Sequence, residues 1–312
     1  MKRALVTGGA GFIGSHLVEG LLKKGYVVRV LDNFATGRRE NLAPVVNKIE
    51  LIDGDVRNLT TVRNACQKVD VVFHEAALPS VERSVKNPLE SNEVNIAGTL
   101  NVLVAARDAG VRRVVYAASS AAYGNTATLP KVETMTPDPL SPYAVGKLAG
   151  EQYMKVFAQL YDLSTISLRY FNIFGPRQDP TTQYAGVIAK FTTCALEGQP
   201  YPVFGDGEQS RDFTYVENAV LANLLAAEAE LDPKQSPLLN IAYGERTTLN
   251  QIIDMLNELT GQNLAAHYGP ERAGDVRDSH ASLERAGAIL AYKPTVDVLE
   301  GLRRTLEWYR GK

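Results

Sequence analysis

The chain of 312 residues is long enough for two domains, or for one large domain with an insertion. Its hydrophobic content of 45% and charged content of 22% are ordinary for a soluble globular protein. The net charge of −2 gives no support for nucleic-acid or membrane-surface partners, and no apolar run approaches the roughly 20 residues of a membrane span.

The two cysteines, Cys66 and Cys194, are isolated from each other, and the four histidines lie in unrelated contexts. This spacing fits neither a zinc site nor a disulfide framework, so we expect no metal. Both cysteines are interpreted as buried thiols in a reducing compartment. The first residues lead directly into a strand pattern without a signal peptide, so the expected location is the cytoplasm.

A dinucleotide-binding pattern opens the chain. A strand over residues 4–7 leads into Gly8, Gly11 and Gly14, a helix follows to about residue 24, and a strand over 27–31 ends at Asp32. In this context glycines let the backbone approach a pyrophosphate, and the helix N-terminus favours its charge. A carboxylate at Asp32 would accept from ribose hydroxyls and repel a 2′-phosphate, which predicts NAD and not NADP.

Two further strands end in residues that suit the same cofactor. The strand over residues 49–52 is followed by Asp55, which either binds the adenine amino group or caps the next helix. The strand over 69–73 is followed by Ala76 and Ala77, which are small enough for a cofactor to pass closely. A polar loop over 33–41 is a place where the adenosine end can rest.

Residues 79–87 are expected to form a loop that carries Ser80, Arg83 and Ser84. A long helix over residues 88–109 contains Asn95, whose amide has either a structural or a functional role. A fifth strand over 112–117 ends near Ser119 and Ser120, whose hydroxyls would face the ligand crevice of a parallel sheet.

The segment SPYAVGK holds the strongest catalytic pattern. Ser141 and Pro142 are typical of an N-cap and first helical residue, so a helix is predicted over 142–160. The spacing of Tyr143 and Lys147 places both side chains on one face of that helix. An ammonium beside a phenol favours the phenolate, so the pair can serve as a general base near neutral pH.

Strands that alternate with helices predict an α/β Rossmann-type doubly wound parallel sheet, with a sixth strand over residues 165–170. After Tyr170 the pattern becomes irregular. We expect an NAD-binding domain over 1–175 and a smaller α/β substrate domain over 176–312, with 215–242 as a candidate return to the first. The later segments are helices over 184–197, 215–229, 248–259, 283–290 and 298–309, a turn over 204–211 and a strand over 238–241.

Taken together, Gly8-x-x-Gly11-x-x-Gly14, Asp32, Ser119, Tyr143 and Lys147 resemble the extended short-chain dehydrogenase/reductase superfamily. The segments RYFNIFGPRQDP, GDGEQSRDFTYVEN and RAGDVRDS resemble its nucleotide-sugar epimerase branch. The resemblance implies UDP-hexose 4-epimerase chemistry with NAD held throughout the cycle. Within that branch the chain is most similar to the UDP-N-acetylhexosamine 4-epimerases. A homodimer that pairs the helices 88–109 and 142–160 is also implied.

The resemblance also implies the role of each site residue. Tyr143 would take the proton of the sugar 4-hydroxyl, Ser119 would hydrogen-bond the same oxygen, and Lys147 would lower the tyrosine pKa. Implied cofactor contacts are Gly8, Gly11, Phe12, Ile13, Asp32, Asn33, Gly37, Asp55, Val56, Ala76, Ala77, Tyr143, Lys147 and Tyr170. Implied contacts with the UDP-sugar are Ser80, Ser84, Ser119, Ser120, Asn172, Val187, Arg211, Arg272, Asp275 and Ser279.

Other branches of the superfamily can be weighed from the residues. The 4,6-dehydratases and decarboxylases carry an acid in the segment that here reads Ser119-Ser120-Ala121-Ala122, so those activities are not expected. UDP-glucuronate 4-epimerase remains an alternative, with Arg83 or Arg177 as a partner of the sugar carboxylate. A dinucleotide-sensing regulator without catalysis is a third reading, and the presence of both Tyr143 and Lys147 opposes it.

Sugar size is predicted from Ser279. Its position resembles the family's gate beside the sugar C2 substituent, where members restricted to UDP-glucose and UDP-galactose carry a tyrosine. A serine leaves room for a 2-acetamido group. The alternative is that Ser279 caps a helix that begins near residue 282.

Overall fold

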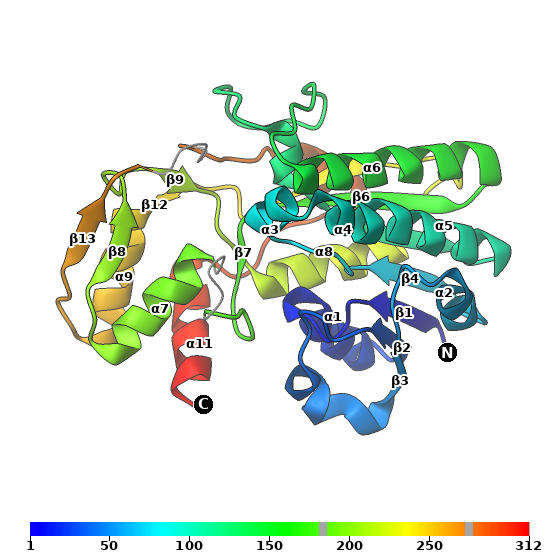
Figure 1. Cartoon of the computed structure of the whole chain (residues 1–312), viewed down its shortest axis with the longest axis horizontal. Helices are drawn as coiled ribbons and strands as arrows, with labels where there is room; N and C mark the ends of the chain where they lie inside the picture. The colour runs from blue at the N-terminus through cyan, green and yellow to red at the C-terminus, as the bar shows by residue number, and fades with distance from the viewer. Residues whose placement is uncertain (181–185, 272–276, 312) are drawn as a thin grey trace.

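The computed structural model describes residues 1–180, 186–271 and 277–311. Its largest element is a seven-stranded sheet in the order β11-β6-β5-β4-β1-β2-β3, and every neighbouring pair in it is parallel (Figure 1). This confirms the predicted doubly wound sheet. The strands are β1 (Arg3–Thr7), β2 (Val27–Asp32), β3 (Ile49–Asp53), β4 (Val71–His74), β5 (Arg113–Ser119), β6 (Ser164–Tyr170) and β11 (Leu238–Ile241).

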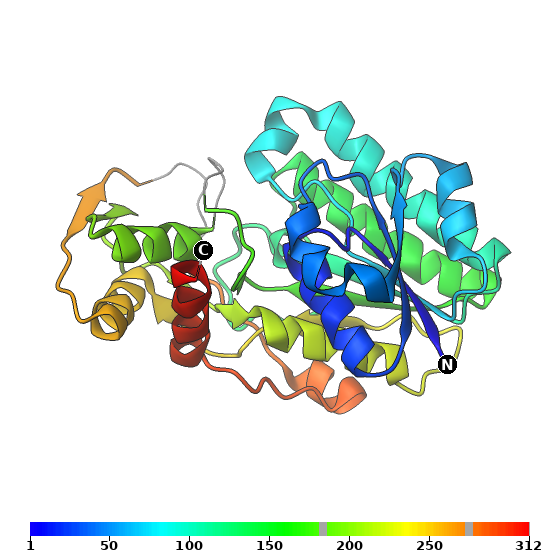
Figure 2. The same ribbon diagram turned by 90° about the horizontal axis from the view of Figure 1, so that it is seen from below.

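Helices cover both faces of the sheet (Figure 2). One face packs against α2 (Leu59–Cys66), α5 (Gly98–Asp108) and α6 (Pro142–Tyr161) through a buried apolar cluster. The other face packs against α1 (Phe12–Lys23), α8 (Val216–Glu228) and α10 (Glu284–Leu290) through a second cluster. The strands are nearly continuous apolar runs because both faces are covered.

A smaller lobe lies beside the carboxyl ends of these strands (Figure 1). Its core joins aromatic and aliphatic side chains of three helices and several short strands. The helices are α7 (Val187–Glu197), α9 (Leu249–Thr260) and α11 (Val298–Arg310). The short strands pair as β7 (Ile173–Phe174) with β10 (Thr214–Tyr215), β8 (Tyr201–Phe204) with β13 (Ala266–Gly269), and β9 (Ser210–Arg211) with β12 (Thr247–Thr248).

Three predicted local structures were wrong. Residues 81–86 form helix α3 (Val81–Lys86) instead of a loop, because the Ser80 hydroxyl caps it by accepting from the Arg83 N–H at 3.1 Å. Part of the expected polar loop over 33–41 belongs to η1 (Arg39–Lys48), a 3₁₀ helix. The long helix is divided into α4 (Pro88–Asn92), a π-helical turn η2 (Glu93–Ala97) and α5. A last short element, η3 (Ser120–Tyr123), follows β5.

The π-helical turn contains Asn95, and its amide has a structural role. The Asn95 side chain accepts from the Leu78 N–H at 2.9 Å and donates to the Leu78 carbonyl at 3.3 Å. Asn95 therefore fixes the backbone that follows β4, directly below the ligand crevice. Such turns often mark functional positions in helices.

In the described ranges, no helix combines the length and apolar character that crossing a membrane requires. The same residues contain no group of three or more His, Cys, Asp or Glu side chains placed to hold a metal ion. Cys66 is buried as expected, whereas Cys194 is partly exposed because it lies toward the edge of the smaller lobe's core.

Candidate active site

A cleft of about 1100 Å³ lies between the carboxyl edge of the large sheet and the smaller lobe. Its walls combine residues of the glycine turn, of β5 and α6, and of α7, β8 and β9. A smaller cavity of about 220 Å³ adjoins it beside the ends of β2 and β3 and shares Gly11, Phe12 and Ile13 with it. A ligand can therefore extend from the smaller lobe, past the glycine turn, to the ends of β2 and β3.

The glycine turn leaves no room for side chains. Gly8 has φ +71°, and a Cβ there would lie 2.7 Å from the Ala76 backbone. A Cβ on Gly14 would lie 2.2 Å from the Gly8 carbonyl oxygen. Helix α1 begins at this turn with Gly11 as N-cap, without a side-chain cap and without an acid in its first turn. The exposed N–H groups of that first turn suit a pyrophosphate, so the cradle fits NAD.

Asp32 closes the turn from the opposite side. Its carboxylate accepts from the Ala10 N–H at 2.8 Å and from the Phe34 N–H at 2.8 Å. Burial raises the pKa of Asp32, and those two backbone hydrogen bonds lower it. A carboxylate offers about four acceptor sites, so two remain for ribose hydroxyls on the side that lines the smaller cavity.

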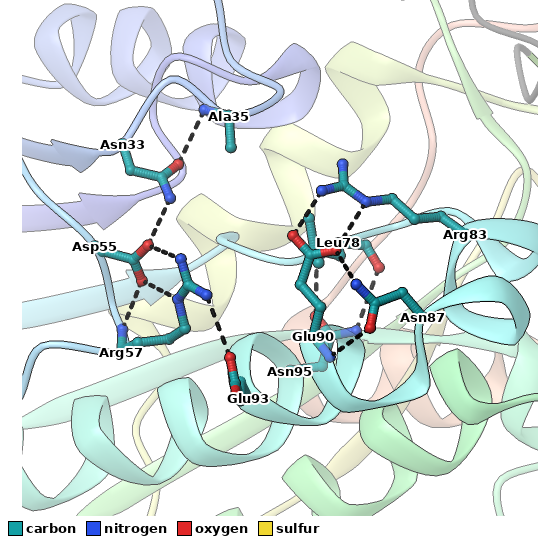
Figure 3. A network of polar contacts seen from close by, with 10 residues as sticks. All are labelled: Asn33, Ala35, Asp55, Arg57, Leu78, Arg83, Asn87, Glu90, Glu93 and Asn95. Carbon is teal, nitrogen blue, oxygen red and sulfur yellow. Dashed lines mark hydrogen bonds and ion pairs between the residues drawn. The ribbon is translucent and has the colours of Figure 1, made fainter.

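Asp55 lies at the far end of the smaller cavity (Figure 3). It accepts from the Asn33 amide at 2.8 Å and from the Arg57 guanidinium at 2.7 Å, which holds the pKa of Asp55 down to about 2. The alternative that Asp55 caps the next helix was wrong. The N-cap of α2 is Asn58, which accepts from the Thr61 N–H at 3.1 Å.

Helix α6 places Tyr143 and Lys147 on the cleft wall as predicted from their spacing. Ser141 caps the helix by accepting from the Ala144 N–H at 3.2 Å, with Pro142 in its first turn. The Ser84 hydroxyl accepts from the Tyr143 N–H at 3.1 Å, which fixes the start of α6 against α3. The Lys147 ammonium is buried and donates to the Ala117 carbonyl at 2.7 Å.

The electrostatics of Tyr143 differ from the simple expectation. Burial is the larger influence and raises the pKa of Tyr143, while a hydrogen bond with Ser119 lowers it. Lys147 does not set a low value by itself, because removal of the phenolate from water opposes its ionisation. Burial also lowers the pKa of Lys147 to about 8, against the neighbouring charges of Glu75 and Glu151.

Glu75, to which no sequence pattern pointed, lines both cavities directly after β4. Its carboxylate accepts from the Tyr170 hydroxyl at 2.9 Å. Burial raises the pKa of Glu75 to about 7, and the Tyr170 hydrogen bond and the Lys147 charge lower it. An acid between His74 and two alanines at the end of a parallel strand was the signal that could have revealed it.

All the residues expected to contact the cofactor line one of the two cavities. Of the residues expected to contact the UDP-sugar, only some line a cavity. Ser80, Ser119, Asn172, Val187 and Arg211 line the main cleft. Three others stand outside its described lining: Ser84, Ser120 and Ser279. Arg272 and Asp275 lie outside the described residues.

Ser279 lies behind the cleft wall, beside Asn172. The Asn172 amide donates to the Ser279 hydroxyl at 3.0 Å and to the Asp212 carbonyl at 3.2 Å. The alternative that Ser279 caps a helix was wrong, because α10 begins at Glu284 and the nearby hydroxyl that accepts from its N–H is that of Ser282. Ser279 therefore contacts the cleft lining through Asn172.

Three arginines of the main cleft are already paired with carboxylates. Arg83 binds Glu90 through two guanidinium nitrogens, at 2.7 and 3.3 Å (Figure 3). Arg38 pairs with Asp179, and Arg177 pairs with Glu19. These pairs balance the positive charge around the cleft.

Comparisons with known proteins agree with this geometry. The model of the NAD dependent epimerase/dehydratase family matches residues 4–242. A putative UDP-glucose 4-epimerase of Methanocaldococcus jannaschii is 38% identical over 98% of this chain and 98% of its own length.

Two solved structures are also similar. The UDP-N-acetylglucosamine 4-epimerase of Methanobrevibacter ruminantium M1 in complex with UDP-N-acetylmuramic acid has a TM-score of 0.94 at 37% identity, with coverage of 99% of this chain and 98% of its own. The UDP-glucose 4-epimerase of Thermus thermophilus in complex with NAD has a TM-score of 0.89 at 39% identity, with 99% of both chains covered. The glycine cradle, the Ser119–Tyr143–Lys147 group and these matches together place the chain among the enzymes of the NAD-dependent epimerase/dehydratase family.

Proposed function

We propose that the protein interconverts the C4 epimers of a UDP-hexose through a transient 4-keto sugar. The observation that carries this proposal is the continuous cleft, which joins the NAD cradle at Gly8 to Tyr143 and then to Arg211 on the smaller lobe. Bound NAD supplies a hydride acceptor that later returns the hydride. Because the net redox change is zero, the cofactor need not leave, and one cleft holding base and sugar together supplies the proximity.

Tyr143, Ser119 and Lys147 would move the proton. Tyr143 takes the proton of the sugar 4-hydroxyl as that carbon is oxidised and returns it when the other epimer forms. The hydrogen bond with Ser119 favours the phenolate and opposes the cost of burial. Lys147 contributes a positive charge from one helical turn away, held in place by the Ala117 carbonyl.

The nucleotide diphosphate would anchor the substrate while the sugar turns over. Arg211 lines the cleft and is oriented by the Ser210 and Arg277 carbonyls at 3.0 and 2.8 Å. The first turn of α7, with Val187 at its start, also lines the cleft. A guanidinium and a helix N-terminus both favour phosphate oxygens. The assignments of Arg272 and Asp275 to the same end remain proposals from the resemblance.

We propose UDP-N-acetylglucosamine and UDP-N-acetylgalactosamine as substrates, together with UDP-glucose and UDP-galactose. The small Ser279 behind Asn172 supports this choice. A tyrosine there would push Asn172 toward the sugar, and overfilling of a packed wall costs roughly 1–3 kcal/mol. The paired state of Arg38, Arg83 and Arg177 favours a neutral sugar over UDP-glucuronate, whose carboxylate would have to compete for one of them.

The deciding experiment is product analysis with UDP-glucose, UDP-N-acetylglucosamine and UDP-glucuronate in parallel, without added nicotinamide. We expect conversion of the first two and none of the third. Stoichiometric NADH accumulation would indicate a dehydrogenase instead. Ser279→Tyr should depress conversion of the acetylated sugar by about tenfold to more than a hundredfold, and that of UDP-glucose far less. Equal losses on both sugars would remove Ser279 from the size selection.

We also propose the homodimer that the resemblance implies, which pairs the helical segment 88–109 with α6, and we extend its interface to the neighbouring α3. Val85 on α3 and Leu89 on α4 are 61% and 76% exposed. Val145, Val156 and Leu160 are 47%, 42% and 68% exposed and follow one stripe of α6. An apolar stripe of this kind supports contact with a second copy.

The division of the chain and its location are proposals as well. An NAD-binding unit over 1–175, with 215–242, and a sugar-binding unit over the remainder are supported by the pairing of β11 with β6 in the large sheet. The two free cysteines support a cytoplasmic location.

A further inference from the structure

Lys147 is a buried cation with two carboxylates among its neighbours. Its side chain is 4% exposed, and its ammonium donates to the Ala117 carbonyl. A carbonyl is a hydrogen-bond acceptor without a net charge, so it cannot replace the water that stabilised the ammonium. The neighbouring charges that raise the pKa of Lys147 belong to Glu75 and Glu151.

Glu151 is committed to another cation. Arg169 binds it with two nitrogens, at 2.8 and 2.7 Å, and both side chains are buried. That pair is close to neutral as a unit, so Glu151 contributes little net charge to Lys147. In the described part of the chain no Arg or Lys forms an ion pair with Glu75, which leaves its carboxylate as the counter-charge of Lys147.

The orientation of Tyr170 shows that Glu75 acts as an acceptor. The Asn223 amide on α8 donates to the Tyr170 oxygen at 2.6 Å. The hydroxyl proton of Tyr170 is then directed to Glu75, 2.9 Å away. A hydrogen bond donated to a carboxylate stabilises its ionised form, so α8 and β6 together favour the anionic form of Glu75 against the effect of its burial.

We propose that Glu75 is a positioning residue whose carboxylate keeps Lys147 in its ammonium form, so that Lys147 can act beside Tyr143. The inference rests on the proposed function for the role of Lys147. The attraction between the two charges rests on the pairing of β4 with β5, which sets Glu75 beside the strand whose Ala117 carbonyl holds the ammonium, and it does not depend on the identity of the sugar. It adds a residue from the end of β4 to a group that otherwise belongs to β5 and α6.

Several other titratable groups surround Lys147, and each has its own partner. Glu151 and Arg169 neutralise each other. His74 is buried between two threonine hydroxyls, and burial together with the Lys147 charge lowers the pKa of His74. The remaining groups are phenols, whose pKa values burial raises: Tyr116, Tyr143 and Tyr170. Among these neighbours, Glu75 is therefore the group that can supply an unpaired negative charge to Lys147 at neutral pH.

The test is the titration of Lys147 itself in the purified enzyme with its bound nucleotide. Trace acetic anhydride acetylates only the neutral amine, and mass spectrometry of the Lys147 peptide across pH gives its apparent pKa. Glu75→Gln should lower that value by about 1 unit or more, as expected on loss of a neighbouring opposite charge. Glu82→Gln, which removes the same charge from the exposed surface of α3, is the matched control and should leave it unchanged.

Two further variants keep the test decisive. Tyr170→Phe retains Glu75 but removes its hydrogen bond. It should therefore also lower the apparent pKa of Lys147, but by less than Glu75→Gln does. Glu75→Asp should restore part of the wild-type value. An unchanged Lys147 titration in Glu75→Gln overturns the inference, whatever the enzyme converts.

Activity then separates this inference from the proposed function. In Glu75→Gln the alkaline limb of the pH profile for UDP-sugar conversion should move to lower pH together with the Lys147 titration. If wild type converts no UDP-sugar, the proposed function fails while the titration still decides the role of Glu75. If conversion is normal and both profiles stay unchanged, Glu75 is not a positioning residue.

Discussion

Tyr143 illustrates how the site is built one residue at a time. Its backbone N–H is held by the Ser84 hydroxyl, and its ring forms part of the cleft wall. Burial raises the pKa of Tyr143, and the hydrogen bond with Ser119 acts in the opposite direction. The backbone contact with Ser84 positions Tyr143 independently of its phenol oxygen, so we expect that oxygen to be removable without loss of the fold.

The first prediction concerns that oxygen. Tyr143→Phe should fold as wild type and lose turnover by the ~10²–10⁴ typical of a general acid–base group. Chromatography of the UDP-sugar products at fixed enzyme concentration measures the loss. Tyr153→Phe, which removes a phenol from the same helix away from the cleft, is the control and should stay active. Comparable activity in the two variants would show that Tyr143 is not the base.

His74 gives a second prediction at this scale, through stability. The Thr99 hydroxyl already donates to the Asn95 carbonyl, so the His74 Nε2–H must donate to Thr99 and Nδ1 must accept from Thr7. The imidazole is neutral, and burial lowers the pKa of His74 from 6.5 to about 3. Between those values the unfolded chain binds a proton that the folded chain does not, so stability falls as pH falls.

This residue should contribute a slope of about 1.4 kcal/mol per pH unit below the unfolded pKa. Urea unfolding between pH 7 and pH 5 should show that the free energy of unfolding of His74→Gln depends on pH less steeply than that of wild type, by that slope. The variant should also be less stable overall. His267→Gln, on the exposed face of β13, should keep the wild-type dependence. A slope unchanged in His74→Gln would mean that burial does not lower the pKa of His74 in the folded protein.

At the scale of elements, α1 and the turn before it form the cofactor cradle. The close approach of Gly14 to the Gly8 carbonyl is what brings the first turn of α1 against the end of β1. Residues of that turn line the space shared by both cavities. This close packing of α1 against β1 depends on the absence of a side chain at Gly14.

Gly14→Ala should therefore weaken NAD binding, because the added Cβ would lie 2.2 Å from the Gly8 oxygen and force the turn to move. We expect a large loss of the nucleotide that copurifies with the protein, measured after heat release by chromatography. Gly287→Ala in α10, whose Cβ would meet its nearest atom at 3.9 Å, is the matched helical control. Full NAD content in Gly14→Ala would show that the turn tolerates a side chain.

At the scale of the whole molecule, the two lobes together form the cleft. The cleft has no complete wall within either lobe, because the NAD cradle and the Arg211 side belong to different ones. The apolar stripe of α6 lies on the opposite side of the helix from the buried Met154. A dimer through this stripe would cover apolar surface without closing the cleft.

Val156→Glu should convert the dimer to a monomer, because a carboxylate would be buried without a partner in the interface. Sedimentation velocity at micromolar concentration measures the change. Val46→Glu is the control, since Val46 has nearly the same exposure, 43% against 42%, but lies on η1. Wild type that sediments as a monomer would remove the dimer proposal.

Short sequence patterns were sufficient to predict the local structure around the site of this protein. The turn from Gly8 to Gly14, the acid at Asp32, and the pair Tyr143 and Lys147 each depend on short spacing within one strand, turn or helix. Backbone geometry converts such spacing directly into shared faces and strand ends. The parallel sheet followed for the same reason, since strands alternated with helical patterns.

The tertiary structure alone decided which distant residues complete the site. The pairing of β4 with β5 brings Glu75 within the influence of the Lys147 charge, α3 sets Ser84 against the Tyr143 N–H, and Ser279 hydrogen-bonds Asn172. It also decided that burial dominates the pKa of Tyr143 and that Asp55 binds Arg57 instead of capping a helix. These outcomes depend on contacts between residues far apart in the chain, and on the loss of water around them, neither of which is encoded in local spacing.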